Sequence, residues 1–179
     1  MKFSKIKWDG ACVELQWTSK LDGAGEVTHA LKSYDTPRPE FVAAMRALVP
    51  HVLEVLELDQ AGWEDTLTVS GLSINEEDDG RRGLVCTCRR ALDIANAPLI
   101  VNTPHIREFR DDEQLKGFLP DAMLAAMEAV EREAELYLAG KRAQGSLFDA
   151  LVPSAYSGIE SVTLSTGGQS VTLKRKGGK

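Results

Sequence analysis

Hydrophobic and polar residues alternate over the first part of the chain, which is the pattern of half-buried β-strands. Segments 2–8 and 11–17 alternate in this way, and Asp9-Gly10 between them is a pair typical of a tight hairpin turn. A third alternating segment, 26–34, follows a turn-forming Leu-Asp-Gly-Ala-Gly sequence. We therefore predict a three-stranded antiparallel meander with one face on a core.

Two other segments show the three-and-four spacing of an amphipathic helix. The first starts near Pro39 and carries an apolar stripe from Phe41 to Val55. Pro50 lies inside this stripe, which predicts a kink or a break into two shorter helices. The second helix opens at Leu119-Pro120-Asp121 and stops at Gly140. Its apolar stripe contains Met123, Met127, Val130, Ala134 and Tyr137.

The remaining segments complete an α+β pattern. Segments 66–74 and 81–92 predict a second hairpin across an acidic turn, and the apolar run 97–105 predicts a buried or central strand. A further hairpin pattern surrounds Gly167-Gly168. The fold class we expect is α+β, with antiparallel strands, two main helices packed on one face of them, and a C-terminal β-hairpin.

These patterns divide the chain into three parts. Residues 1–140 form the predicted core domain, residues 141–158 a linker that contains a short linear motif, and residues 159–179 the hairpin and a basic tail. A two-stranded hairpin is marginally stable by itself in water, so we expect it to dock on the body or on a partner.

The charge of the chain is unevenly distributed. The net charge is −6, yet residues 152–179 contain four basic residues and one acidic residue. An acidic body repels nucleic acid, so we expect no direct nucleic-acid binding except through the basic tail at Lys174, Arg175 and Lys176. The apolar runs are too short to span a bilayer and the N-terminus lacks a signal-peptide core, which favours the cytoplasm.

The sequence contains no recognisable catalytic or metal-binding motif. The three histidines fall on a predicted strand, a helix and a loop, without the spacing of a metal site. Cys86 and Cys88 lie two residues apart on a predicted strand, so they face one side, where we expect buried thiols; a metal or redox role is the alternative. We therefore expect no catalytic residues, no metal and no cofactor.

One short segment indicates a protein partner. Gln144-Gly145-Ser146-Leu147-Phe148 resembles the linear motif by which bacterial polymerases and repair proteins bind the sliding clamp, Gln-Leu-Ser/Asp-Leu-Phe in its fullest form. Gln144, Ser146, Leu147 and Phe148 match, and Gly145 replaces the leucine, which should weaken binding. The resemblance implies that Leu147 and Phe148 enter an apolar pocket, while Gln144 and Ser146 make polar contacts. Alternatively, Leu147 and Phe148 fold back on the preceding helix as a hydrophobic cap.

A broader resemblance covers roughly residues 1–148. The segments Tyr-Asp-Thr-Pro-Arg-Pro-Glu-Phe, Ala-Pro-Leu-Ile-Val-Asn-Thr-Pro and Ala-Gln-Gly-Ser-Leu-Phe are similar to those of uncharacterised proteins of tailed bacteriophages and prophages. That resemblance implies a bacterial host cytoplasm and no particular mechanism.

We accordingly expect a non-enzymatic phage accessory protein that docks on the host replication or recombination machinery through residues 144–148. One alternative is an enzyme acting on a nucleotide or nucleic acid, with a site near the loop 103–118. Its candidate residues are His105, Arg107, Glu108 and Arg110. Another is a self-assembling structural protein whose C-terminal hairpin adds a strand to a neighbouring sheet. The sequence does not indicate an oligomeric state.

Overall fold

The computed structural model of the chain forms two compact units, Met1–Ala143 and Gln144–Lys179. The residues that the structure describes are 1–21, 25–77, 80–95, 97–108 and 119–143, together with the backbone of 161–166 and 169–174.

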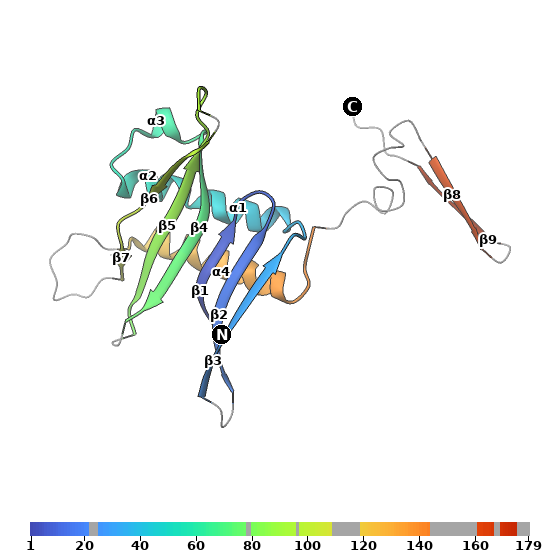
Figure 1. Ribbon diagram of the computed structural model, residues 1–179, viewed down its shortest axis with the longest axis horizontal. Helices are drawn as coiled ribbons and strands as arrows, with labels where there is room; N and C mark the ends of the chain where they lie inside the picture. Colours follow the sequence, from blue (N-terminus) through green and yellow to red (C-terminus); the bar gives the residue numbers. More distant parts are fainter. Residues whose placement is uncertain are drawn as a thin grey trace. The chain divides into compact units, whose positions relative to one another are not determined.

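The described part of the first unit contains a seven-stranded sheet. Its strands are adjacent in the order β3-β2-β1-β4-β5-β6, and β7 pairs with β5 (Figure 1). The described pairs are all antiparallel. The strands are β1 (Lys2–Trp8), β2 (Val13–Leu21), β3 (Gly25–Ser33), β4 (Leu67–Glu76), β5 (Arg82–Arg90), β6 (Leu99–Asn102) and β7 (Ile106–Arg107).

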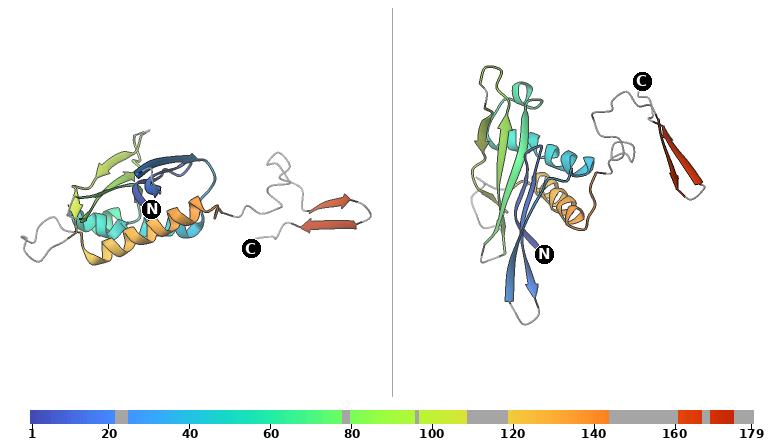
Figure 2. Two further views of the ribbon diagram at one scale, coloured as in Figure 1. Left: turned by 90° about the horizontal axis from the view of Figure 1, so that it is seen from below. Right: turned by 45° about the vertical axis from the view of Figure 1, so that its right-hand side comes forward.

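Helices cover one face of this sheet. Figure 2 shows the two longest helices, α1 and α4, side by side against that face. The helices are α1 (Pro39–Ala47), α2 (Val49–Val55), α3 (Gln60–Trp63) and α4 (Asp121–Leu138). The predicted α+β fold, with antiparallel strands and the main helices on one face, is confirmed.

The core lies between the sheet and the helices. Its side chains are apolar and alternate along the strands or recur every third or fourth position along the helices, as the sequence pattern predicts. Fully buried members include Ile6, Leu15, Leu72 and Leu84 from the sheet, and Phe41, Leu48, Met123, Met127 and Tyr137 from the helical layer.

The predicted interruption at Pro50 is a break between two helices. α1 ends at Ala47 and α2 begins at Val49, with Pro50 in the first turn of α2. Proline has no backbone N–H, and its ring would clash with the carbonyl four residues earlier if α1 continued. The apolar stripe nevertheless runs across the break, because Met45, Leu48 and Val52 are all buried.

The position of the strand predicted in segment 97–105 differs from expectation. The sequence indicated a buried or central strand, but β6 is the last strand of the sheet order, and Leu99 and Ile100 are 39% and 51% exposed. The apolar run was misleading because β6 pairs with β5 over four residue pairs and its other edge faces away from the sheet. Local hydrophobicity does not encode the order of strands.

The second unit contains a described antiparallel hairpin of β8 (Ser161–Thr166) and β9 (Gln169–Lys174). Val162 pairs with Leu173, and Leu164 pairs with Val171. The hairpin predicted around Gly167-Gly168 is therefore present, with apolar residues opposite one another in the register.

Candidate functional site

The residues of the predicted docking motif fall outside the described part of the chain. Gln144, Ser146, Leu147 and Phe148 are among them, as are Arg175 and Lys176 of the basic tail. Lys174, the remaining basic-tail residue, is the last residue of β9. The structure does describe the segment that leads directly into the motif, from the end of α4 to Ala143.

The C-terminus of α4 closes in a Schellman turn. Gly140 has a φ of +87°, a left-handed conformation that glycine adopts without strain. The Gly140 amide donates to the Tyr137 carbonyl at 3.1 Å, and the Lys141 amide donates to the Leu136 carbonyl at 2.9 Å. These two hydrogen bonds define the motif and satisfy carbonyl groups that the end of a helix leaves open.

Residues on either side of this turn tie the end of α4 to the body. The guanidinium carbon of Arg142 lies 3.4 Å from the centre of the Tyr137 ring, and Tyr137 itself is buried. The Tyr137 hydroxyl donates to the Asp35 carbonyl at 2.8 Å. The Ala143 amide donates to the Thr36 carbonyl at 2.9 Å. These contacts hold the residues up to Ala143, the last residue of the first unit.

The candidate residues of the enzymatic alternative are already engaged by neighbouring side chains where they are described. His105 Nε2 lies 2.8 Å from Asn75 Oδ1, a hydrogen bond between the β4 end and the residue before β7. Arg107 Nη1 lies 3.8 Å from Glu77 Oε1. Arg110, the remaining basic candidate, lies outside the described residues.

Glu108, the acidic candidate, is held by Arg82 at the start of β5. The Arg82 backbone amide donates to Glu108 Oε2 at 3.0 Å, and Arg82 Nε donates to Glu108 Oε1 at the same distance. The same guanidinium reaches Glu128 and Glu131 on α4, at 2.8 and 3.4 Å. This network joins β5, the segment after β7 and α4, so it is a structural connection between layers.

A cleft of about 560 Å³ opens at the opposite end of β5 from Glu108. The pairing of β1 with β4 covers Lys5–Lys7 and Gly71–Ser73 and goes no further. Beyond it, Trp8 on one side and Leu67–Ser70 on the other line the cleft, with α1 beneath. The register of β4 against β5 shifts between Val69 and Gly71. A β-bulge increases the local twist, and here it accompanies the separation of β4 from β1.

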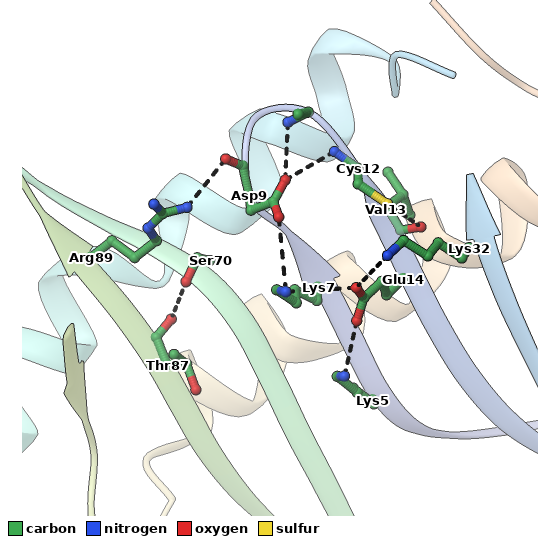
Figure 3. A network of polar contacts seen from close by, with 11 residues as sticks. Lys5, Lys7, Asp9, Cys12, Val13, Glu14, Lys32, Ser70, Thr87 and Arg89 are labelled. Carbon is green, nitrogen blue, oxygen red and sulfur yellow. Dashed lines mark hydrogen bonds and ion pairs between the residues drawn. The ribbon is translucent and has the colours of Figure 1, made fainter. Parts of the chain in front are cut away.

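Arg89 crosses this cleft from β5. Its Nη1 donates to the Asp9 carbonyl at 3.4 Å, as Figure 3 shows. The Asp9 carboxylate is engaged elsewhere and accepts from the amides of Ala11 and Cys12 at 3.1 and 2.9 Å. These hydrogen bonds lower the pKa of Asp9, with smaller contributions from Lys7 and Arg89. The carboxylate therefore stays ionised and secures the β1–β2 turn at the edge of the cleft.

A cluster of lysines surrounds Glu14 on the outer face of the sheet (Figure 3). Glu14 lies 3.0 Å from the Lys5 ammonium and 3.7 Å from those of Lys7 and Lys32. The hydrogen bond from Lys5 lowers the pKa of Glu14, and the charges of the three lysines add to this effect. Three adjacent strands thus share one ionised carboxylate.

Replacement of Glu14 by glutamine is expected to lower the free energy of unfolding by up to about 1 kcal/mol at neutral pH. A folded-state pKa below the unfolded value stabilises the fold above the unfolded pKa, and this contribution is lost as pH falls through the folded pKa. Thermal unfolding of both proteins from pH 7 down to pH 2 should therefore show a difference that shrinks in acid. Glu54→Gln, at an exposed position of α2, is the control. A deficit that is independent of pH would contradict the assignment.

Cys86 and Cys88 lie on the inner face of β5, as the two-residue spacing predicted. Both are fully buried, and burial raises the pKa of each thiol to about 12. A thiol with such a pKa is protonated at neutral pH and is a poor nucleophile. Within the described residues, no group of three or more His, Cys, Asp or Glu side chains is placed to hold a metal ion.

Comparisons with known proteins found no match. No protein-family model matches the chain, and no curated protein or solved structure does so either. Of the helices in the described ranges, none combines the length and the apolar content needed to cross a membrane.

Proposed function

We propose that this chain is a non-enzymatic phage accessory protein that acts in the cytoplasm of a bacterial host. It docks on the host replication or recombination machinery by inserting residues 144–148 into the peptide pocket of the sliding clamp. The body, residues 1–143, then recruits or blocks another component of that machinery.

The closure of α4 supports this proposal most directly. The competing interpretation uses Leu147 and Phe148 as a hydrophobic cap on α4. The Schellman turn at Gly140 and Lys141 already satisfies carbonyl groups at the end of the helix. Arg142 covers a face of the Tyr137 ring in the last turn. The helix end thus has its cap within the described residues, and Leu147 and Phe148 are not required for it.

The boundary between the units supports the same interpretation. The first unit ends at Ala143, and Gln144, the first residue of the motif, opens the next unit. A peptide anchor reaches its pocket in an extended form, and a motif that starts directly after the first unit is separate in sequence from the fold of that unit. Lys141 and Arg142 precede the motif and would favour encounter with an acidic partner surface.

The test is calorimetric titration of the full chain into a bacterial sliding clamp. We expect binding in the micromolar range, which the double substitution Leu147→Ala and Phe148→Ala abolishes because it removes both apolar anchors. The matched control is Leu151→Ala with Val152→Ala, which removes two apolar side chains just beyond the motif and should leave the affinity unchanged.

A second variant is expected to tighten binding instead of abolishing it. Gly145→Leu restores the leucine of the fullest motif and should tighten binding roughly tenfold, because it adds one buried apolar side chain. All variants should unfold at the wild-type temperature if 144–148 is not part of the folded body. The proposal would be contradicted if neither the double alanine substitution nor Gly145→Leu changed the affinity for the clamp. A lower unfolding temperature of the double variant would also contradict it.

A further inference from the structure

The cleft between β1 and β4 combines a partly exposed apolar floor with the guanidinium of Arg89. We propose that it binds a small organic anion with an apolar body, which places its anionic group on Arg89 and its apolar part against α1. The cleft lies within residues 1–143, and binding there is independent of docking through residues 144–148.

The size and the floor of the cleft fit such a ligand. A volume of about 560 Å³ lies within the range of small-molecule sites, roughly 300–1,000 Å³. Val42, Met45 and Val49 of the helical layer line it, as do Trp8, Leu67 and Val69 of the sheet. Val42 is 41% exposed although it lies in this apolar surface. An apolar ligand would remove that surface from water.

Two arginines, Arg46 and Arg89, and three carboxylates line the cleft; of the carboxylates, Glu64 and Asp65 are exposed to solvent and Asp9 belongs to the β1–β2 turn. Arg89 is the group that would bind an anion. Arg89 points across the opening, and its hydrogen bond to the Asp9 carbonyl is long, at 3.4 Å. A guanidinium has five N–H donors in a planar fork, so this contact leaves donors for a carboxylate, sulfonate or phosphate. The negative charge of Asp9 is offset by the amides of Ala11 and Cys12, which donate to its carboxylate, and by the Lys7 ammonium at 3.8 Å.

The position of Arg89 is fixed by the strand that carries it. The Thr68 hydroxyl donates to the Arg89 carbonyl at 3.1 Å, and the Ser70 hydroxyl donates to the Thr87 carbonyl at 3.1 Å. Ser70 is 5% exposed and sits at the bulge of β4. Both hydroxyls therefore hold β5 against β4 where the sheet has separated from β1. A binding group on such a rigid element keeps its geometry without a ligand.

A second cation near the opening provides a contrast. Arg46 also lines the cleft, but its side chain is 76% exposed and lies 3.8 Å from the Asp65 carboxylate. An exposed and already paired guanidinium contributes little to binding an anion. Of the two arginines at the cleft, Arg89 is therefore the one that binds the anion.

The probe for the test is anilinonaphthalene sulfonate, an aromatic anion whose fluorescence rises in apolar sites. Titration into the full chain should show one saturable site with energy transfer from tryptophan, because Trp8 lines the cleft. Arg89→Met should weaken binding at least about tenfold, whereas Arg46→Met should change it less than about twofold. Val42→Trp fills the cleft from an exposed position and should also weaken binding at least tenfold.

Two controls keep the outcome unambiguous. Ile94 is 99% exposed in the β5–β6 connection, so Ile94→Ser tests whether the probe binds to exposed apolar surface outside the cleft. The unfolding temperature of each variant tests whether that variant is folded. If Arg89→Met does not fold, Val42→Trp decides the result. Loss of binding in a folded Arg89→Met, or in Val42→Trp where Arg89→Met does not fold, with retention in Ile94→Ser supports the site. Unchanged binding in a folded Arg89→Met or in Val42→Trp, or loss only in Ile94→Ser, overturns it.

Discussion

Replacing Tyr137 by alanine is expected to lower the free energy of unfolding by about 4 kcal/mol, as for other large aromatic side chains in cores. Tyr137 is 1% exposed and lies where α1 meets α4. Its ring centre is 6.2 Å from that of Phe41, in a tilted arrangement. Truncation would leave a cavity between the two helices and would remove the contact with Arg142.

Tyr137→Phe separates the ring from the hydroxyl. It keeps the packing and removes the hydrogen bond to the Asp35 carbonyl, so we expect a loss of about 1 kcal/mol. Urea unfolding followed by circular dichroism measures both variants. A Tyr137→Ala loss below about 2 kcal/mol would mean that α4 does not depend on this contact. The comparison also bears on the proposed function, because the last turn of α4 precedes the docking motif.

Most of the fold could be predicted because its elements depend on local patterns. The alternation around Ile6 and Leu15 predicted β1 and β2, and the helical spacing of Met123 and Tyr137 predicted α4. Pro50 predicted the break between α1 and α2 for a reason of backbone chemistry, since a proline inside a helix removes a hydrogen bond. Each of these signals needs only a few neighbouring residues.

The order of the strands depended on contacts that the sequence does not display. β1 pairs with β4 across more than 60 intervening positions, as in the pair of Ile6 with Leu72. That pairing places β4 and β5 in the middle of the sheet and leaves β6 at its edge. An apolar strand such as Leu99–Asn102 has the same local pattern at the edge and in the centre, so the prediction of a buried or central strand was wrong.

The cleft likewise arises from non-local geometry. It exists because the β1–β4 pairing stops at Lys7 and Gly71, and because β4 bulges beside Ser70. One local signal was present: Ser70-Gly71 interrupts a strand of apolar residues, and a glycine inside a strand often marks a bulge. The approach of Arg89 to Asp9 could not be read from the sequence, because 80 positions separate the two residues.

Removal of the Arg82 guanidinium should have the second large effect, and this effect depends on pH. Arg82 contacts three carboxylates, those of Glu108, Glu128 and Glu131. We expect Arg82→Met to lower the free energy of unfolding by about 2–3 kcal/mol at neutral pH, because partly buried carboxylates then lose their partner. Arg82→Lys keeps the charge without the planar fork, so it should recover part of this loss.

The pH dependence follows from Glu131, whose side chain is 20% exposed. Burial raises the pKa of Glu131, and the charge of Arg82 opposes that rise. A folded-state pKa above the unfolded value gives a contribution that is fully present below the unfolded pKa and is lost as pH rises through the folded pKa. Without Arg82 the pKa of Glu131 rises further, so more stability is lost between acid and neutral pH.

The deficit of Arg82→Met should accordingly be largest at pH 7 and shrink toward pH 4, as acid protonates Glu131. Urea unfolding of wild type, Arg82→Met and the double variant Arg82→Met with Glu131→Gln measures this. The glutamine removes the unpaired charge, so the double variant should be more stable than Arg82→Met at pH 7 and similar to it at pH 4. Equal deficits at both pH values would show that Arg82 stabilises the layers by packing of its aliphatic stem and not by compensating the carboxylates.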